Sequence, residues 1–107
     1  MAKKLLWLDD FRNPLDFVHG EYDITWVKNY DEFCKWITEN GLPYTICFDH
    51  DLGEEKSGYD CAKFTVDFCQ SHHLDIPEFE IQSANPVGKE NITALMNCWH
   101  RVFLSGE

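Results

Sequence analysis

The fold is most strongly constrained by two stretches, Lys4-Leu-Leu-Trp-Leu-Asp-Asp10 and Tyr44-Thr-Ile-Cys-Phe-Asp-His-Asp51. In each of them a short apolar run ends abruptly in acidic residues. Because the apolar residues are continuous rather than alternating, both runs are typical of strands buried on two faces of a parallel sheet. Weaker apolar runs at Ile24–Lys28 and Glu78–Gln82 predict flanking or edge strands.

Helical patterns alternate with these strands. A capping-box pattern at Asn29 begins a helix that Gly41 ends, and Gly58–His73 has the wide apolar surface of a helix packed on a sheet. Asn85-Pro86 has the cap-then-proline form of a helix start. The connection at Phe11–Asp23 is short, so we expect a loop there with at most one short helix. Right-handed βαβ units then predict a three-layer α/β sandwich with a small parallel sheet in the order 2-1-3-4.

Length and composition indicate one folded domain, residues 1–107, with 44% hydrophobic and 26% charged residues. Nine Lys+Arg against 19 Asp+Glu give a net charge of −10. This charge excludes extended nucleic-acid binding through clustered basic residues, but not a small phosphate ester held through a metal ion.

No apolar run approaches the ~20 residues of a membrane span, and the first residues lack the pattern of a signal peptide. Five cysteines without a Cys-x-x-Cys pair suggest reduced thiols. We therefore expect a soluble, cytoplasmic protein that does not contact membranes, with its oligomeric state left open.

Polar clusters follow three of the predicted strands: Asp9-Asp10, Asp49-His50-Asp51 and Ser83-Ala84-Asn85. The carboxyl ends of parallel strands form the ligand crevice of an open sheet. Four carboxylates in one crevice repel each other unless a cation lies among them, and oxygen-only ligands favour Mg²⁺ first and Mn²⁺ or Ca²⁺ next. We therefore expect a metal site at Asp9, Asp10, Asp49 and Asp51. The alternative is that these residues are solvated loop and capping acids.

Other polar residues near these strand ends fit a phosphate site. His50 lies between two acids and is a candidate general acid/base, or else a surface histidine. Ser83, Asn85 and Gly88 surround a helix start, where N–H groups favour an anion, although simple capping explains Ser83 and Asn85 equally. Arg12 is a candidate phosphate clamp, or else an ion-pair partner of the acids that precede it.

At these residues the sequence resembles a known family. Leu6–Pro14, Phe48–Gly53, Ser57–Asp60 and Ser83–Ile92 are similar to motifs of the cyclic-phosphate processing receiver-like domain family, a divergent branch of the response-regulator receiver fold. The resemblance covers nearly the whole chain, with the motifs in order. It implies a receiver-like sheet and a role in processing cyclic phosphates.

The resemblance also implies roles for individual residues. Asp9 and Asp10 match the metal-binding acids of receivers, Asp49 the phosphoacceptor position, and Ser83 the hydroxyl residue after the fourth strand. Two departures stand out. Gln82 occupies a position where the family has histidine, and the fifth strand of receivers, with its phosphate-binding lysine, is missing. Signalling through a phosphorylated aspartate is therefore the least expected activity.

Two functions remain in competition. The first is a metal-dependent phosphoesterase that acts on a cyclic or terminal phosphate of a nucleotide or RNA end, with Asp49, His50 and Asp51 as catalytic residues. The second is an inactive receiver-like module that binds a phosphate ligand or a partner protein, which Gln82 favours. We favour the first only narrowly.

Overall fold

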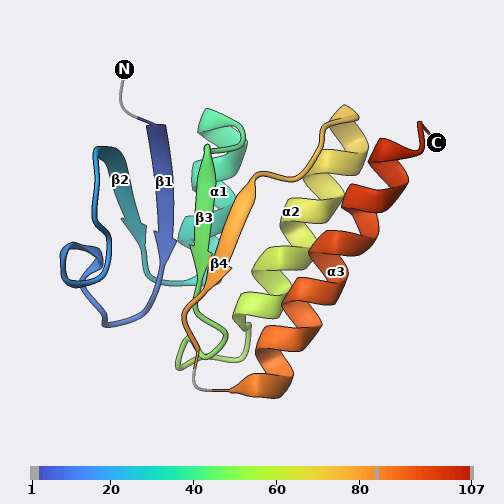
Figure 1. Ribbon diagram of the computed structural model, residues 1–107. Coiled ribbons are helices and arrows are strands. Elements are labelled where there is room, and N and C mark those ends of the chain that lie inside the picture. The colour runs from blue at the N-terminus through green and yellow to red at the C-terminus, as the bar shows by residue number, and fades with distance from the viewer. Residues whose placement is uncertain (1–2, 84, 107) are drawn as a thin grey trace.

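The computed structural model describes residues 3–83 and 85–106, and within them a parallel four-stranded sheet forms the centre of the fold. The strands are β1 (Lys3–Leu8), β2 (Tyr22–Val27), β3 (Thr45–Phe48) and β4 (Glu78–Ile81), in the spatial order β2-β1-β3-β4 (Figure 1). The last four residues of β1 and all of β3 are buried, whereas the edge strands are partly exposed. The predicted α/β class, strand order and division into central and edge strands are therefore confirmed.

The helices begin where the capping residues predict. They are α1 (Tyr30–Asn40), α2 (Gly58–His72) and α3 (Pro86–Leu104), and a short 3₁₀ helix, η1 (Pro14–Asp16), lies in the connection between β1 and β2. Side chains cap each α-helix: Asn29 accepts from the Glu32 N–H, Ser57 from the Tyr59 N–H and Asn85 from the Gly88 N–H. None of the helices in the described part of the chain is long and apolar enough to cross a membrane.

The two faces of the sheet are covered unequally, unlike those of a regular three-layer sandwich. All three α-helices lie on one face of the sheet, where side chains such as Leu6, Ile46 and Phe48 form the main core with them (Figure 1). The crossovers from β2 to β3 and from β3 to β4 run in the same direction, so their right-handedness places α1 and α2 on the same face. Only the β1–β2 connection runs the other way. The third layer is therefore this loop with η1, because the connection is too short to hold a longer helix.

The thinly covered face has its own small core of Leu5, Trp7 and Cys47, packed by the β1–β2 connection and by side chains of β2. A groove of about 720 Å³ opens on this face, lined in part by the same three residues and by Glu78 and Glu80 of the edge strand. The acidic residues at the strand ends do not line it. The candidate site is therefore separate from this groove.

Candidate functional site

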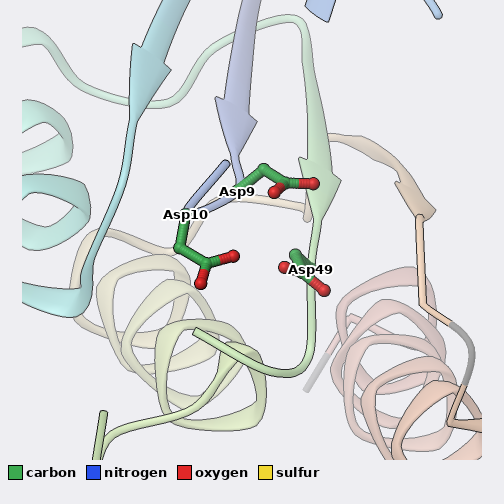
Figure 2. Close-up of side chains that lie close together, drawn as sticks. All are labelled: Asp9, Asp10 and Asp49. Atoms are coloured by element: carbon green, nitrogen blue, oxygen red, sulfur yellow. The ribbon is translucent and has the colours of Figure 1, made fainter. Parts of the chain in front are cut away.

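Three carboxylates meet at the carboxyl ends of the two central strands. Asp9 and Asp10 follow β1, and Asp49 follows β3, which pairs directly with β1. Figure 2 shows the three side chains facing a common space between these strand ends. One ligand oxygen from each lies within 4.8 Å of the others. We refer to Asp9, Asp10 and Asp49 as the acid cluster.

Asp9 is fully buried and is fixed by the backbone that follows it. Its Oδ1 atom accepts hydrogen bonds from the N–H groups of Phe11 and Arg12, at 3.0 and 2.9 Å. Its Oδ2 atom has no hydrogen-bond partner among the described residues, and lies 3.9 Å from the Arg12 guanidinium. Oδ1 therefore positions the side chain, while Oδ2 remains available to a ligand.

Asp10 presents a second unsatisfied oxygen. Its Oδ1 atom is buried and has no hydrogen-bond partner within the parts of the chain that the structure describes. Gly53, at a φ of +68°, approaches the other oxygen so closely that a Cβ there would lie 3.2 Å from Asp10 Oδ2. The loop after β3 therefore packs against Asp10 at position 53. Glycine is favoured there because φ is positive and because a side chain would crowd the Asp10 carboxylate.

Asp49 completes the cluster in an environment that opposes its charge. It is 5% exposed, and burial together with the nearby Asp9 carboxylate raises the pKa of Asp49 to about 6. The Asp51 N–H and the Arg12 guanidinium act in the opposite direction but do not cancel the increase in pKa. Buried carboxylates with unpaired oxygens are costly unless a cation compensates them.

The acid cluster fits a hard divalent cation on its chemistry. All converging donors are carboxylate oxygens, which Mg²⁺, Mn²⁺ and Ca²⁺ prefer over the softer metals. Asp9 Oδ2 and Asp10 Oδ1 are buried and have no hydrogen-bond donor within the described chain, which fits a site that takes up a cation. Asp9, Asp10 and Asp49 are therefore the residues that could hold it.

Asp51 differs from the expectation. Its side chain is 73% exposed and lies outside the acid cluster, and its Oδ1 atom lies 3.1 Å from Nδ1 of His50. The backbone after β3 turns so that Asp49 points into the site and Asp51 points to solvent. Asp51 therefore belongs with His50 rather than with the acid cluster.

His50 is held against the start of α3. A Cβ on Gly88 would overlap the His50 ring, so the ring packs directly on the glycine backbone. The Gly88 N–H already donates to Asn85 Oδ1 at 3.1 Å, which leaves no free donor for a phosphate. Gly88 is one of the residues that the sequence predicts for phosphate binding, and in the structure its lack of a side chain makes room for the His50 ring.

Arg12 lies beside the acid cluster, whereas Ser83 and Asn85 lie between the end of β4 and the start of α3, and each of the three has part of its hydrogen-bonding capacity in use. Arg12 Nη1 donates to the Gln82 carbonyl at 3.0 Å, so the guanidinium bridges the ends of β1 and β4. Ser83 Oγ accepts from the Asn85 N–H at 3.1 Å, which leaves its hydroxyl hydrogen unassigned. Asn85 caps α3 through its oxygen and retains its amide hydrogens.

Sequence reasoning missed two supporting contacts. The Trp26 indole on β2 donates to the Asp9 carbonyl at 2.8 Å and holds the end of β1 from the edge strand. Gly58 packs so closely on the Asp49 carbonyl that a Cβ would overlap it. The first contact carries no sequence signal, because Trp26 reads as an ordinary strand residue. For Gly58, only its place in the family motif indicates a special position.

The family model for the cyclic-phosphate processing receiver domain matches residues 4–98. A search of curated proteins found no match.

Two solved structures share the fold. One is a fusion that carries the trimeric coiled coil of yeast Spc42, with a TM-score of 0.64 and 15% identity over 99% of this chain and 84% of that chain. The other is a response regulator receiver protein from Sinorhizobium medicae WSM419, with a TM-score of 0.53 and 12% identity over 92% of this chain and 97% of that chain. At these identities the similarity shows the fold alone. The match of the family model over residues 4–98 shows that this chain belongs to the cyclic-phosphate processing receiver domain family.

Proposed function

We propose that the acid cluster binds Mg²⁺, or Mn²⁺ in its place, and that the protein hydrolyses a cyclic or terminal phosphate of a nucleotide or RNA end. The observation that carries this proposal is that Asp9, Asp10 and Asp49 converge, while two buried oxygens, Asp9 Oδ2 and Asp10 Oδ1, have no hydrogen-bond partner among the described residues. When bound, the metal ion supplies positive charge that polarises a phosphate oxygen. The family name supports a phosphate ligand of this class.

The residues near the acid cluster would supply hydrogen-bond donors to the phosphate. Arg12 uses one N–H group on the Gln82 carbonyl and has further donors for the non-reacting phosphate oxygens. The hydroxyl of Ser83 and the side-chain amide of Asn85 add donors from the end of β4 and the start of α3.

His50 is the candidate for proton transfer. With its Nδ1 atom donating to Asp51, the Nε2 atom carries a lone pair and can take up or deliver a proton. The ring is 19% exposed and is supported by Gly88, so its orientation is restricted before a ligand arrives. Asp51 then acts as a positioning residue, which holds the ring and its tautomer.

A binding module without turnover is the second candidate. Gln82 supports it, because this position carries histidine in the family that the sequence resembles, and glutamine does not transfer protons near neutral pH. In this case the same cluster and donors would hold the phosphate without breaking it.

The test is ³¹P NMR of the protein with Mg²⁺ and a panel of 2′,3′-cyclic, 3′,5′-cyclic and terminal nucleotide phosphates. A phosphoesterase gives a new product resonance that disappears with EDTA and falls by about 100-fold or more in Asp49→Asn. Asp67→Asn is the matched control, since Asp67 is an exposed acid on α2 and the charge change is the same. Product formed in the presence of EDTA, or undiminished in Asp49→Asn, contradicts the proposal. Mg²⁺-dependent line broadening without product favours the binding module.

A further inference from the structure

Phe11 is a large apolar side chain exposed beside the acid cluster. It follows Asp10 directly and is 71% exposed. Its position is nevertheless restrained, because its N–H group donates to the buried Asp9 Oδ1 atom at 3.0 Å. The turn that fixes Asp9 therefore also places the Phe11 ring at the rim of the site.

The ring is connected to the cluster through Arg12. The guanidinium carbon of Arg12 lies 5.5 Å from the centroid of the Phe11 ring. The same guanidinium lies 3.9 Å from Asp9 Oδ2 and is held by its hydrogen bond to the Gln82 carbonyl. An aromatic ring, a cation and the acid cluster thus lie in sequence along one rim, and a phosphate bound at the cluster and Arg12 would have the ring beside it.

The charge of the protein limits what this ring can recognise. At a net charge of −10 the protein as a whole repels a phosphate, and a metal ion together with the nearby Arg12 would offset this repulsion at the site. Stacking of a nucleobase on an aromatic face is not opposed by that charge, since the base is neutral. Such stacking contributes about 1–3 kcal/mol per base, which is roughly 5- to 150-fold in affinity.

We propose that Phe11 is the stacking platform for the base of a nucleoside phosphate whose phosphate group binds at the acid cluster. This inference rests on the proposed function and deepens it: the ring selects nucleoside phosphates over sugar phosphates and inorganic phosphate. A sugar phosphate has no face to stack, so it gains nothing from Phe11.

The test compares ligands that differ in the base. Binding of adenosine 3′- and 5′-monophosphate is measured by calorimetry in Mg²⁺, beside ribose 5-phosphate. The wild-type protein is expected to prefer the better adenosine ligand over ribose 5-phosphate by about 5-fold or more, and Phe11→Ala is expected to lose this preference. Phe11→Tyr keeps it, whereas Phe11→Leu, which is apolar but has no ring, loses it.

Leu15→Ala is the matched control, because Leu15 is 74% exposed in the same β1–β2 connection, and it is expected to behave as wild type. Stacking also predicts an upfield shift of the adenine protons in wild type that is absent in Phe11→Ala. Equal affinity of wild type for the adenosine ligands and ribose 5-phosphate overturns the role of Phe11 but leaves the phosphate site intact. A decrease in affinity in Phe11→Ala that is the same for both ligand types has the same meaning. If none of the ligands binds in the presence of Mg²⁺, the stacking platform is overturned, and so is the proposed function toward terminal phosphates.

Discussion

Asp49 is held in surroundings that oppose its own negative charge. It is almost fully buried, lies beside Asp9 and Asp10, and has its pKa raised to about 6. A residue that served only the stability of the fold would not be placed in this way, because ionised carboxylates in contact destabilise the folded state. This loss of stability is expected at a carboxylate that serves to bind a ligand.

Asp49→Asn is therefore expected to stabilise the metal-free protein. At pH 7.5 in EDTA, the free energy of unfolding should rise by about 1–3 kcal/mol, because the amide removes the buried like charge. In millimolar Mg²⁺ the order should reverse, since only the wild type gains stability from the ion. Urea denaturation in the two buffers measures both effects, with Asp67→Asn as the control. A variant that is less stable than wild type in EDTA would show that Asp49 is a structural residue.

The first turns of α2 and α3 contact the segment that follows β3 through two glycines. Gly58 begins α2 against the backbone of Asp49, and Gly88 lies in the first turn of α3 against the ring of His50. The difference between the two contacts is physical: a main-chain carbonyl held in place after β3 cannot rotate away, whereas a side-chain ring can. Helix start and site geometry are thus coupled at both elements.

Alanine at the two glycines is expected to have different consequences. Gly58→Ala should lower the free energy of unfolding by about 3 kcal/mol or more, because its Cβ overlaps main-chain atoms of Asp49 and His50. Gly88→Ala should change it by only about 1 kcal/mol or less, because the helix propensity gained offsets the displaced ring. Urea denaturation measures both values, and the NMR signals of the His50 ring report its movement. Equal destabilisation by the two variants, or an unmoved His50 ring in Gly88→Ala, would contradict this account.

At the scale of the whole molecule, the protonation of Asp49 is linked to folding, and through it to the metal binding that we propose. The pKa of Asp49 is raised from 3.8 to about 6 by folding, so the folded protein binds more protons than the unfolded chain between these values. The contribution of Asp49 to stability is therefore fully present below pH 3.8 and is lost as the pH rises through about 6. A cation at the cluster reverses this loss, because it binds the ionised carboxylate.

Mg²⁺ is accordingly expected to stabilise the protein more as the pH rises. The increase in melting temperature that Mg²⁺ causes should be small at pH 5 and complete by about pH 7, since Asp49 must lose its proton to bind the ion. Thermal melts at constant ionic strength, with and without Mg²⁺, measure this difference. Asp49→Asn should show no such increase with pH. An effect of Mg²⁺ on wild type that is the same at pH 5 and pH 7 would exclude Asp49 as a ligand.

The sequence alone determined the strands, the helix starts and the order of the sheet. These features depend on local signals: the continuous apolar runs at Lys4–Leu8 and Tyr44–Phe48, the caps at Asn29 and Asn85, and the handedness of parallel connections. It also indicated that acids following two neighbouring strands would approach each other, because parallel strands end at the same edge.

Only the tertiary structure decided which side chains face the site. Asp49 and Asp51 are two residues apart, yet one is buried in the cluster and the other is exposed, because the direction of a side chain after a strand ends depends on how the loop packs. The role of Gly88 in making room for His50, and the packing of α3 on the same face as α1 and α2, depend in the same way on contacts between distant segments. Such contacts depend on how segments far apart in the chain pack together. Local patterns of apolar and capping residues do not predict them.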